Sequence, residues 1–309
     1  MILDCCNTDR NFRFHKVHIE LFPNYRLEPT NTSAFARSQN TSIKSNYAQE
    51  SFQRRFSNFI DFSKFNVYWF SSSRQFLRTY FDSAVKKSVS GLKIANYSNS
   101  RYLSSCISEI FPNVSLNCSE NDNNLFICDF GYAGLAESNE VIDDAWSFDL
   151  VRASEHLANG CKVYVTSLTK SFGMPFGSMV IAHKNIILQS DLLEHQRLFL
   201  MQEIGEMYLE FEQVSKRRRD TLETLLRGLQ EIGSNYFGFV PEFPGAAVIK
   251  LISNFDEVAF KKLLNLHGIR GTSYFGNQAI VIPCHQNLDE SDANIMIEII
   301  KHIHRYSIM

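Results

Sequence analysis

Short apolar runs alternate with segments of helical periodicity between residues 47 and 183. Strands are predicted where apolar residues cluster, and helices where apolar residues recur every three or four positions. The predicted strands are 66–70, 92–97, 125–130, 140–145, 161–167 and 177–183, and the predicted helices are 47–62, 74–88, 101–111 and 148–158. This alternation predicts an α/β domain with a mostly parallel sheet that helices cover on both faces.

The segments on either side of this region have a different pattern. Residues 1–46 are polar and rich in Asn, Ser and Thr, which predicts an arm or loop region. From residue 185 to about 232 the spacing is helical, with an interruption near 202–207. After it, strands such as 246–252 and 279–283 mix with helices at 255–266 and 289–304, the pattern of an α+β domain. The expected division is an arm at 1–46, a large α/β domain at 47–235 and a small α+β domain at 236–309.

Composition narrows the class of protein. The chain has 309 residues, 44% of them hydrophobic, and a formal net charge of −2, so no global attraction to nucleic acid is expected. No apolar run is long enough to cross a bilayer, and the first residues lack the pattern of an export signal. The 7 cysteines are scattered and odd in number, which favours reduced thiols. We therefore predict a cytoplasmic protein that binds neither nucleic acid nor membrane.

Two further features have an ordinary and a functional interpretation. The basic run Lys216–Arg219 is flanked by acidic residues, so a solvated or interface-facing side of a helix is favoured over nucleic-acid binding. His285, beside Cys284, is interpreted as a packing histidine at a strand end, because no third group marks a metal site or a nucleophile. No metal is predicted.

Lys170 carries the main chemical hypothesis. It follows the predicted strand 161–167 in the segment SLTKSFGMPFG, with Ser167 before it and two glycines, Gly173 and Gly177, after it. A lysine that forms an imine must lose its proton, which partial burial favours. Small residues let the backbone approach a flat ring, and a serine hydroxyl can bind phosphate. Taken alone, an ordinary lysine in a turn explains the segment equally well.

Acidic residues end two of the predicted strands. The segment VIDDAW places Asp144 at a strand end, where ligands of parallel sheets bind, and LFICDF ends similarly at Asp129. A carboxylate there can keep the nitrogen of a pyridine ring protonated, so that the ring withdraws electrons from the substrate carbon. Asp143 and Asp144 are adjacent and should point to opposite sides, so one of the two serves. We favour Asp144, with Asp129 as the alternative.

A hydroxyl-rich turn completes the pattern. Ser72 and Ser73 lie between the strand 66–70 and a helix, and Arg74 follows them. Backbone N–H groups at a helix start, serine hydroxyls and an arginine form an anion site, although simple capping of the helix explains the serines too. A phosphate site, a carboxylate and a lysine, each after a strand and in this order, predict pyridoxal 5'-phosphate (PLP) bound as a Schiff base on Lys170.

These segments resemble the fold-type I PLP enzymes, and more narrowly the DegT/StrS family of sugar aminotransferases. VIDDAW is similar to the family's I-E-D-A-A, SLTKSFGMPFG to its lysine segment, and VIPCHQNLDESD to its closing L-P-x-H segment. The resemblance implies Lys170 as Schiff-base lysine and proton shuttle and Asp144 as pyridinium partner. The cofactor contacts that it implies are Ser72, Ser73, Arg74 and Ser167, with Ser147 where the family carries Gln or His.

The resemblance also implies an activity. It is the transfer of an amino group from an amino acid, expected to be glutamate, to a keto group of a nucleotide-linked sugar, by a homodimer. Two alternatives stay open. One is another fold-type I PLP enzyme, such as a lyase, dehydratase or decarboxylase, because the cofactor residues are shared. The other is a non-catalytic binding or scaffold subunit, since the segment between LFICDFGYAG and VIDDAW is shorter than the family's usual spacing.

Overall fold

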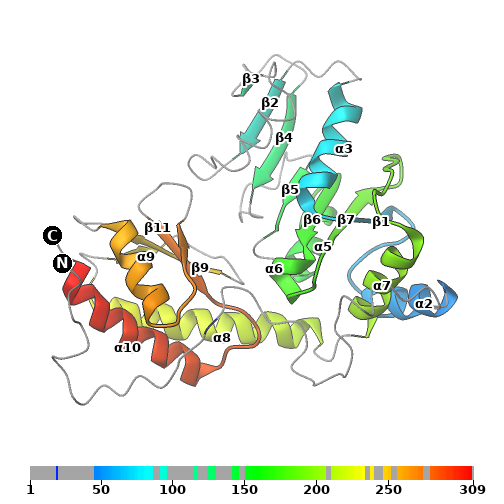
Figure 1. The fold of residues 1–309 in the computed structure, drawn as a ribbon. Helices are drawn as coiled ribbons and strands as arrows, with labels where there is room; N and C mark the ends of the chain where they lie inside the picture. Colours follow the sequence, from blue (N-terminus) through cyan, green and yellow to red (C-terminus); the bar gives the residue numbers. More distant parts are fainter. Residues whose placement is uncertain are drawn as a thin grey trace.

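A computed structural model gives the arrangement of the chain in two lobes, each built around its own β-sheet (Figure 1). The structure describes residue 19 and the ranges 45–85, 91–95, 115–116, 124–129, 141–145, 150–206, 210–233, 237–239, 246–251, 256–273 and 279–307. The helix predicted at 101–111, most of the predicted arm at 1–46 and Ser147 lie outside these residues.

The large lobe holds a seven-stranded sheet with the order β1-β7-β6-β5-β4-β2-β3. Pairing is parallel from β6 through β5, β4 and β2 to β3, whereas β7 runs antiparallel to both β6 and β1. The predicted, mostly parallel sheet is therefore confirmed. Its strands are β1 (Phe65–Phe70), β2 (Gly91–Ala95), β3 (Ser115–Leu116), β4 (Asn124–Asp129), β5 (Val141–Asp143), β6 (Val163–Ser167) and β7 (Ser178–His183).

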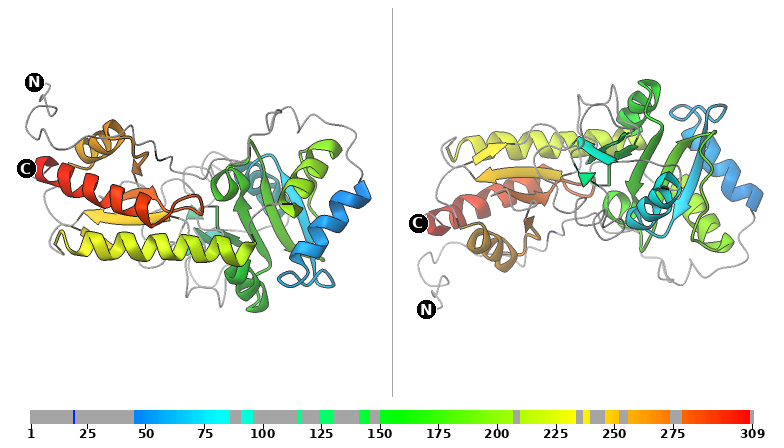
Figure 2. Two further views of the ribbon diagram at one scale, coloured as in Figure 1. Left: turned by 90° about the horizontal axis from the view of Figure 1, so that it is seen from below. Right: turned by 90° about the horizontal axis from the view of Figure 1, so that it is seen from above.

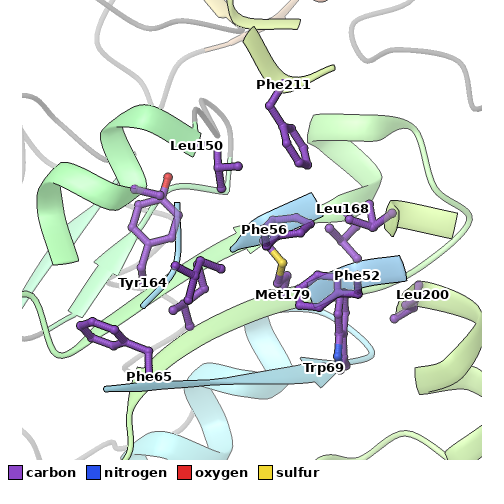
Figure 3. Packing of buried hydrophobic residues seen from close by; sticks show 14 of the residues in the cluster. Phe52, Phe56, Phe65, Trp69, Leu150, Tyr164, Leu168, Met179, Leu200 and Phe211 are labelled. Atoms are coloured by element: carbon purple, nitrogen blue, oxygen red, sulfur yellow. The ribbon is translucent and has the colours of Figure 1, made fainter. Parts of the chain in front are cut away.

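Alternate side chains of the central strands enter separate cores on the two faces of this sheet. Ile142, Tyr164 and Ile181 face one core, which Figure 3 shows from close by with Phe52, Phe56 and Trp69 packed together. Their neighbours along the strands face the other core with Phe76 and Leu77. The first face is covered by α2 (Ser45–Phe56), α5 (Leu150–Ala158), α6 (Leu168–Phe172) and α7 (Glu194–Gly205), and the second by α3 (Ser73–Val85).

The segment 184–193 is not helical, although the sequence predicted a helix from residue 185. Leu188 is buried against the sheet, whereas Ile187 is 87% exposed. Ser190 and Asp191 then bond to the end of β1, through the carbonyl of Trp69 and through Ser71 respectively. These long-range contacts fix residues 184–193 along the strand ends. Helix α7 therefore begins only at Glu194.

The small lobe is an antiparallel four-stranded sheet, β10-β11-β9-β8, packed against three helices. Its core joins Leu225, Phe260, Ile282 and Ile300, and it includes Ile19, which forms a parallel bridge to Ile269. The elements are α8 (Phe211–Gln230), β8 (Phe237–Phe239), β9 (Ala246–Leu251), α9 (Glu257–Leu266), β10 (Thr272–Ser273), β11 (Ala279–Pro283) and α10 (Glu290–Ser307).

Helix α8 connects the two lobes (Figure 2). Phe211 at its start belongs to the large-lobe core, and Leu225 and Leu229 near its end belong to the small-lobe core. Its 20 residues correspond to about 30 Å of helix, enough to reach both. Among the helices of the described ranges, none combines the length and the apolar character needed to cross a membrane.

Candidate functional site

The carboxyl ends of the parallel strands meet at one edge of the large sheet. The strand pairing aligns Asp129 with Asp143, and Asp143 with Val165 of β6. On the other side of β6, Ser167 is aligned with Ser178, which also faces Phe70 at the end of β1. The strand ends that the sequence analysis singled out are therefore neighbours at the edge of the sheet where ligands of such folds bind.

Lys170 lies on the short helix α6, which starts directly after β6. The sequence predicted a turn here. Ser167 is the N-cap residue in an extended conformation, and Gly173 ends the helix with a left-handed φ of 66°, its N–H donating to the carbonyl of Thr169 at 3.1 Å. Glycine adopts this conformation with little strain. The lysine is thus held on one helical turn at the sheet edge, with an intermediate degree of exposure.

Hydroxyl groups brace this turn from both sides. The side chains of Thr166 and Ser171 are hydrogen-bonded at 3.1 Å, and those of Ser167 and Thr169 at 2.9 Å. Ser178 on the adjacent strand donates from its hydroxyl to the carbonyl of Thr166 at 2.7 Å. Because these bonds join β6, α6 and β7, the backbone that carries Lys170 is fixed on the sheet.

Gly177 ties the lysine segment to the serine turn. Its φ is 111°, and its N–H donates to the carbonyl of Ser71 at 3.1 Å while its carbonyl accepts from Leu168 at 3.0 Å. A Cβ atom at this position would lie 2.9 Å from a methyl carbon of Leu200. The backbone conformation therefore favours glycine here, and a methyl group would also have to displace the end of the Leu200 side chain.

The serine turn forms a helix start, as the capping interpretation predicts. Ser72 accepts a hydrogen bond from the N–H of Gln75 at 3.2 Å, and the first turn of α3 presents its backbone N–H groups at this end. Ser72 and Arg74 have exposed side chains, and that of Ser73 is half-buried. Ser71 is engaged differently, because its N–H donates to Asp191 at 2.9 Å and its hydroxyl bonds the same carboxylate.

Asp143 is a buried carboxyl group whose pKa is affected by the charge of Lys170. The side chain is only 3% exposed, and burial raises its pKa to about 6, against the lowering effects of Lys170 and of the N–H of Ala145. That N–H lies 3.2 Å from the carboxylate. Sequence reasoning passed over Asp143 in favour of its neighbour, because the pattern alone does not show that the charge of Lys170 acts on Asp143.

Asp144 directly follows β5 and is bonded to β6. It is fully buried, its carboxylate accepts a hydrogen bond from the hydroxyl of Tyr164, and its N–H donates to the carbonyl of Val165 at 2.8 Å. The ring of His156 stacks near Tyr164, with 6.2 Å between the ring centroids. Asp129 is described as part of β4, beside Asp143 in the sheet.

His285 and one residue of the basic run 216–219 lie in buried surroundings. His285 is buried, and its Nδ1 accepts from the N–H of Asn287 at 3.3 Å, as expected for a packing histidine. The described residues contain no cluster of three potential metal ligands. In the basic run, Arg218 is buried and Lys216 and Arg219 are exposed, so one arginine of the run points inward from α8 while its neighbours lie at the surface.

Two cavities bounded by described residues lie elsewhere. One, of about 270 Å³, lies between α2, β1 and α7 and has Trp69 and Arg197 in its wall. The other, of about 320 Å³, lies between the end of α2 and the start of α8, beside Arg54 and Glu210. Lys170 lines neither of them, so the candidate site rests on the arrangement of residues at the sheet edge.

Comparison of the sequence finds no matching protein-family model and no matching curated protein. Comparison of the structure does find relatives. A NifS-like protein from Rickettsia africae ESF-5 has a TM-score of 0.63 at 13% identity, covering 87% of this chain and 92% of that one. An 8-amino-7-oxononanoate synthase from Francisella tularensis has a TM-score of 0.60 at 14% identity, covering 87% and 95%.

A third similar structure is the serine palmitoyltransferase from S. paucimobilis with bound PLP and myriocin. Its TM-score is 0.59 at 11% identity, with 90% of this chain and 80% of that chain covered. At these identities the similarity is one of architecture, and the predicted fold class is confirmed by it. The chain has the α/β fold of the fold-type I PLP enzymes.

Proposed function

We propose that this protein binds PLP covalently through the amine of Lys170 and acts on an amino acid. The observation that carries the proposal is the position of Lys170 on the helical turn that directly follows β6, at the carboxyl edge of a fold-type I sheet, where its charge also acts on the buried Asp143. Lys170 is half-buried, and its helical turn is fixed on the sheet. A lysine amine in such a place can act as a nucleophile.

The residues present fit this cofactor. The left-handed Gly173 and Gly177 keep the backbone close around the lysine, and the first turn of α3 offers N–H groups to a phosphate. Ser72, Ser73, Ser167 and Arg74 are the proposed phosphate contacts, with Ser147 as a further one. Asp191, which bonds Ser71, adds a negative charge at one side of the turn and restricts the phosphate to the side of Ser72.

The two adjacent acids receive different roles in this proposal. Asp144 is the proposed partner of the ring nitrogen, and the hydroxyl of Tyr164 fixes its carboxylate. Asp143 stabilises the ammonium form of Lys170 through its charge and is the counter-ion of the unloaded lysine. Asp129, next to Asp143 in the sheet, remains the alternative for the ring nitrogen.

When bound, PLP supplies an electron-withdrawing ring that stabilises negative charge at the substrate carbon. The chain's own residues supply the rest. Lys170, released from the cofactor by the incoming amine, holds and moves the proton at the substrate carbon. The bonded hydroxyls of Thr166 and Ser171 keep the lysine turn in place during this transfer.

We propose aminotransfer as the reaction, with an amino acid such as glutamate as donor and a keto group, in a nucleotide-linked sugar, as acceptor. The support is the resemblance of the aspartate and lysine segments to DegT/StrS enzymes. The second candidate is acyl transfer to an amino acid, because two of the similar structures are by name a palmitoyltransferase and a synthase. The proposed assembly is a homodimer in the cytoplasm.

The visible spectrum of the purified protein tests the cofactor. With added PLP, the wild type should show the absorbance of the lysine-bound cofactor, and borohydride should fix the cofactor on the peptide that contains Lys170. Lys170→Ala should lose both, whereas Lys162→Ala, an exposed lysine that directly precedes β6, should keep both. Wild-type protein without either signal would refute the proposal.

A half-reaction separates the activities. Glutamate added to the loaded protein should convert the bound cofactor to its aminated form, at a much lower rate in Asp144→Asn than in Asp129→Asn. A cofactor that is bound but does not respond to glutamate, and responds to another amino acid only when an acyl thioester is present, would favour acyl transfer. A cofactor that responds to neither would favour a non-catalytic subunit.

A further inference from the structure

Arg218 of the basic run reaches from α8 to the lysine helix. Its side chain is 2% exposed, and its Nη2 donates to the carbonyl of Ser171 at 2.6 Å. Ser171 directly follows Lys170 on α6, so this carbonyl belongs to the backbone that holds the lysine. The run that looked like a surface patch in the sequence thus contributes one buried cation to the candidate site.

Gln286 makes the same connection from the small lobe. It follows β11, and its amide nitrogen donates to the carbonyl of Ser171 at 3.0 Å. Its side-chain oxygen accepts from Nε of Arg218 at 2.9 Å. The three groups form a closed triangle in which one carbonyl of α6 receives two donors, and the two donors also bond each other.

The triangle is buried and directional. Gln286 is 4% exposed, and the backbone around both residues is fixed, because the thiol of Cys284 lies 3.4 Å from the carbonyl of Arg218. A hydrogen bond with a charged donor is about twice as strong as a neutral one. Any movement of the small lobe that shifts Gln286 must therefore move Ser171 or break these bonds.

We infer that Arg218 and Gln286 are positioning residues that couple the small lobe to the orientation of Lys170. They act through the Ser171 carbonyl, and neither is assigned a contact with substrate. The catalytic part of this inference rests on the proposed function of Lys170. The mechanical part, the fixing of α6, does not depend on any cofactor.

Hydrogen exchange on the cofactor-free full chain tests the mechanical part. Arg218→Gln should speed exchange in the peptide covering 168–174 by about tenfold or more, because loss of a charge-assisted hydrogen bond weakens the local structure by about 1.4 kcal/mol or more. The control is Arg219→Gln, which changes the exposed next residue of the same helix and should leave this exchange unchanged. Equal exchange in Arg218→Gln and wild type would overturn the inference.

Gln286→Glu tests the two hydrogen bonds of the glutamine separately. It also serves as a second variant in case Arg218→Gln does not fold. A glutamate keeps the acceptor for Arg218 and loses the donor to Ser171, so exchange in 168–174 should rise while α10 stays protected. Arg218→Lys keeps a charged donor and should restore part of the protection lost in Arg218→Gln. Faster exchange confined to the small lobe in these variants would contradict a role at Lys170.

The spectrum of the loaded protein tests the catalytic part. The pH midpoint of the lysine-bound cofactor should shift in Arg218→Gln and Gln286→Glu but not in Arg219→Gln, because the direction of Lys170 sets the geometry of its bond to the ring. An unshifted midpoint together with faster exchange would refute the catalytic part of the inference and leave the mechanical part standing. If the wild type binds no PLP, the proposed function fails while the exchange result stands on its own.

Discussion

The N–H of Gly177 donates to the carbonyl of Ser71 at 3.1 Å, which joins the segment after Lys170 to the turn after β1. These two residues are more than a hundred positions apart in the sequence, and they become neighbours because β7 pairs with β1. The bond places the lysine helix and the helix start of α3 at a fixed separation, as a ligand that touches both would require.

Substitution of Gly177 tests this connection. Gly177→Ala places a methyl group 2.9 Å from Leu200 on a backbone with a φ of 111°. Positive φ costs an L-residue about 1–2 kcal/mol, and the overpacking adds about 1–3 kcal/mol. The free energy of unfolding, measured in urea, should fall by the sum of these two costs. Gly160→Ala is the matched control, since its φ is 95° with no atom within 4 Å, and it should show the conformational cost alone. Equal losses in the two variants would mean that Leu200 moves aside freely.

The buried carboxyl of Asp143 should make stability depend on pH. Its pKa is about 6 in the folded state and near 3.8 in the unfolded state, so between these values the folded state holds a proton that the unfolded state has lost. Stability therefore falls as pH rises through this window, by roughly 3 kcal/mol in total. Asp143→Asn should remove this fall from the curve of unfolding free energy against pH.

Asp61→Asn is the control for the pH experiment. The exposed Asp61 accepts hydrogen bonds from Ser63, which lower its pKa, so its contribution is present at neutral pH and lost in acid. The difference curve of this variant should have the opposite sign to that of Asp143→Asn. If the curve of Asp143→Asn falls between pH 4 and 6 as much as that of the wild type, the carboxyl of Asp143 does not titrate as a buried group.

Tyr164 should contribute to stability through Asp144. Tyr164→Phe removes the hydroxyl that donates to this buried carboxylate and is expected to cost about 1–3 kcal/mol in urea unfolding. Tyr68→Phe removes a hydroxyl that donates at 2.9 Å to the neutral carbonyl of Ile186 in a half-buried place, and should cost about 1 kcal/mol. A smaller loss for Tyr164→Phe than for Tyr68→Phe would contradict the structural importance of the Tyr164 bond.

Glu203 on α7 offers a second pH-dependent group. Burial, and secondarily the charge of Glu206, raise its pKa from 4.5 to about 7. The folded state again holds the extra proton, so the group lowers stability as pH rises from about 4.5 to 7. Glu203→Gln should raise the melting temperature at pH 8 relative to wild type and leave it nearly unchanged at pH 4. Glu206→Gln should shift the midpoint of this effect to lower pH, because one cause of the raised pKa is gone.

Much of the fold could be predicted from hydrophobic periodicity. The strands at β1, β4, β6 and β7 and the helices α3, α9 and α10 lie within a few residues of the predicted ranges, because each has a regular pattern of apolar residues in the sequence. The short elements were missed. The five-residue α6 depends on Gly173 and on bonds to β7, and the two-residue β3 and three-residue β8 depend on pairing with distant strands.

The site could be predicted only as far as local sequence determines it. The position of Lys170 after a strand and the helix-capping role of Ser72 follow from local pattern, and both are seen. The effect of Lys170 on Asp143 depends on the register of β5 against β6, and the inward position of Arg218 depends on a contact with Gln286, 68 residues away. Such long-range geometry leaves no periodic signal in the sequence.

The parallel bridge between Ile19 and Ile269 affects the order in which the two lobes can fold. The two residues are 269 − 19 = 250 positions apart, and both belong to the core of the small lobe. During synthesis, Ile19 emerges long before Ile269. The apolar side chain of Ile19 therefore stays exposed to water while the large lobe folds. Closing so long a loop is slow, and the small lobe is therefore expected to reach its final packing last.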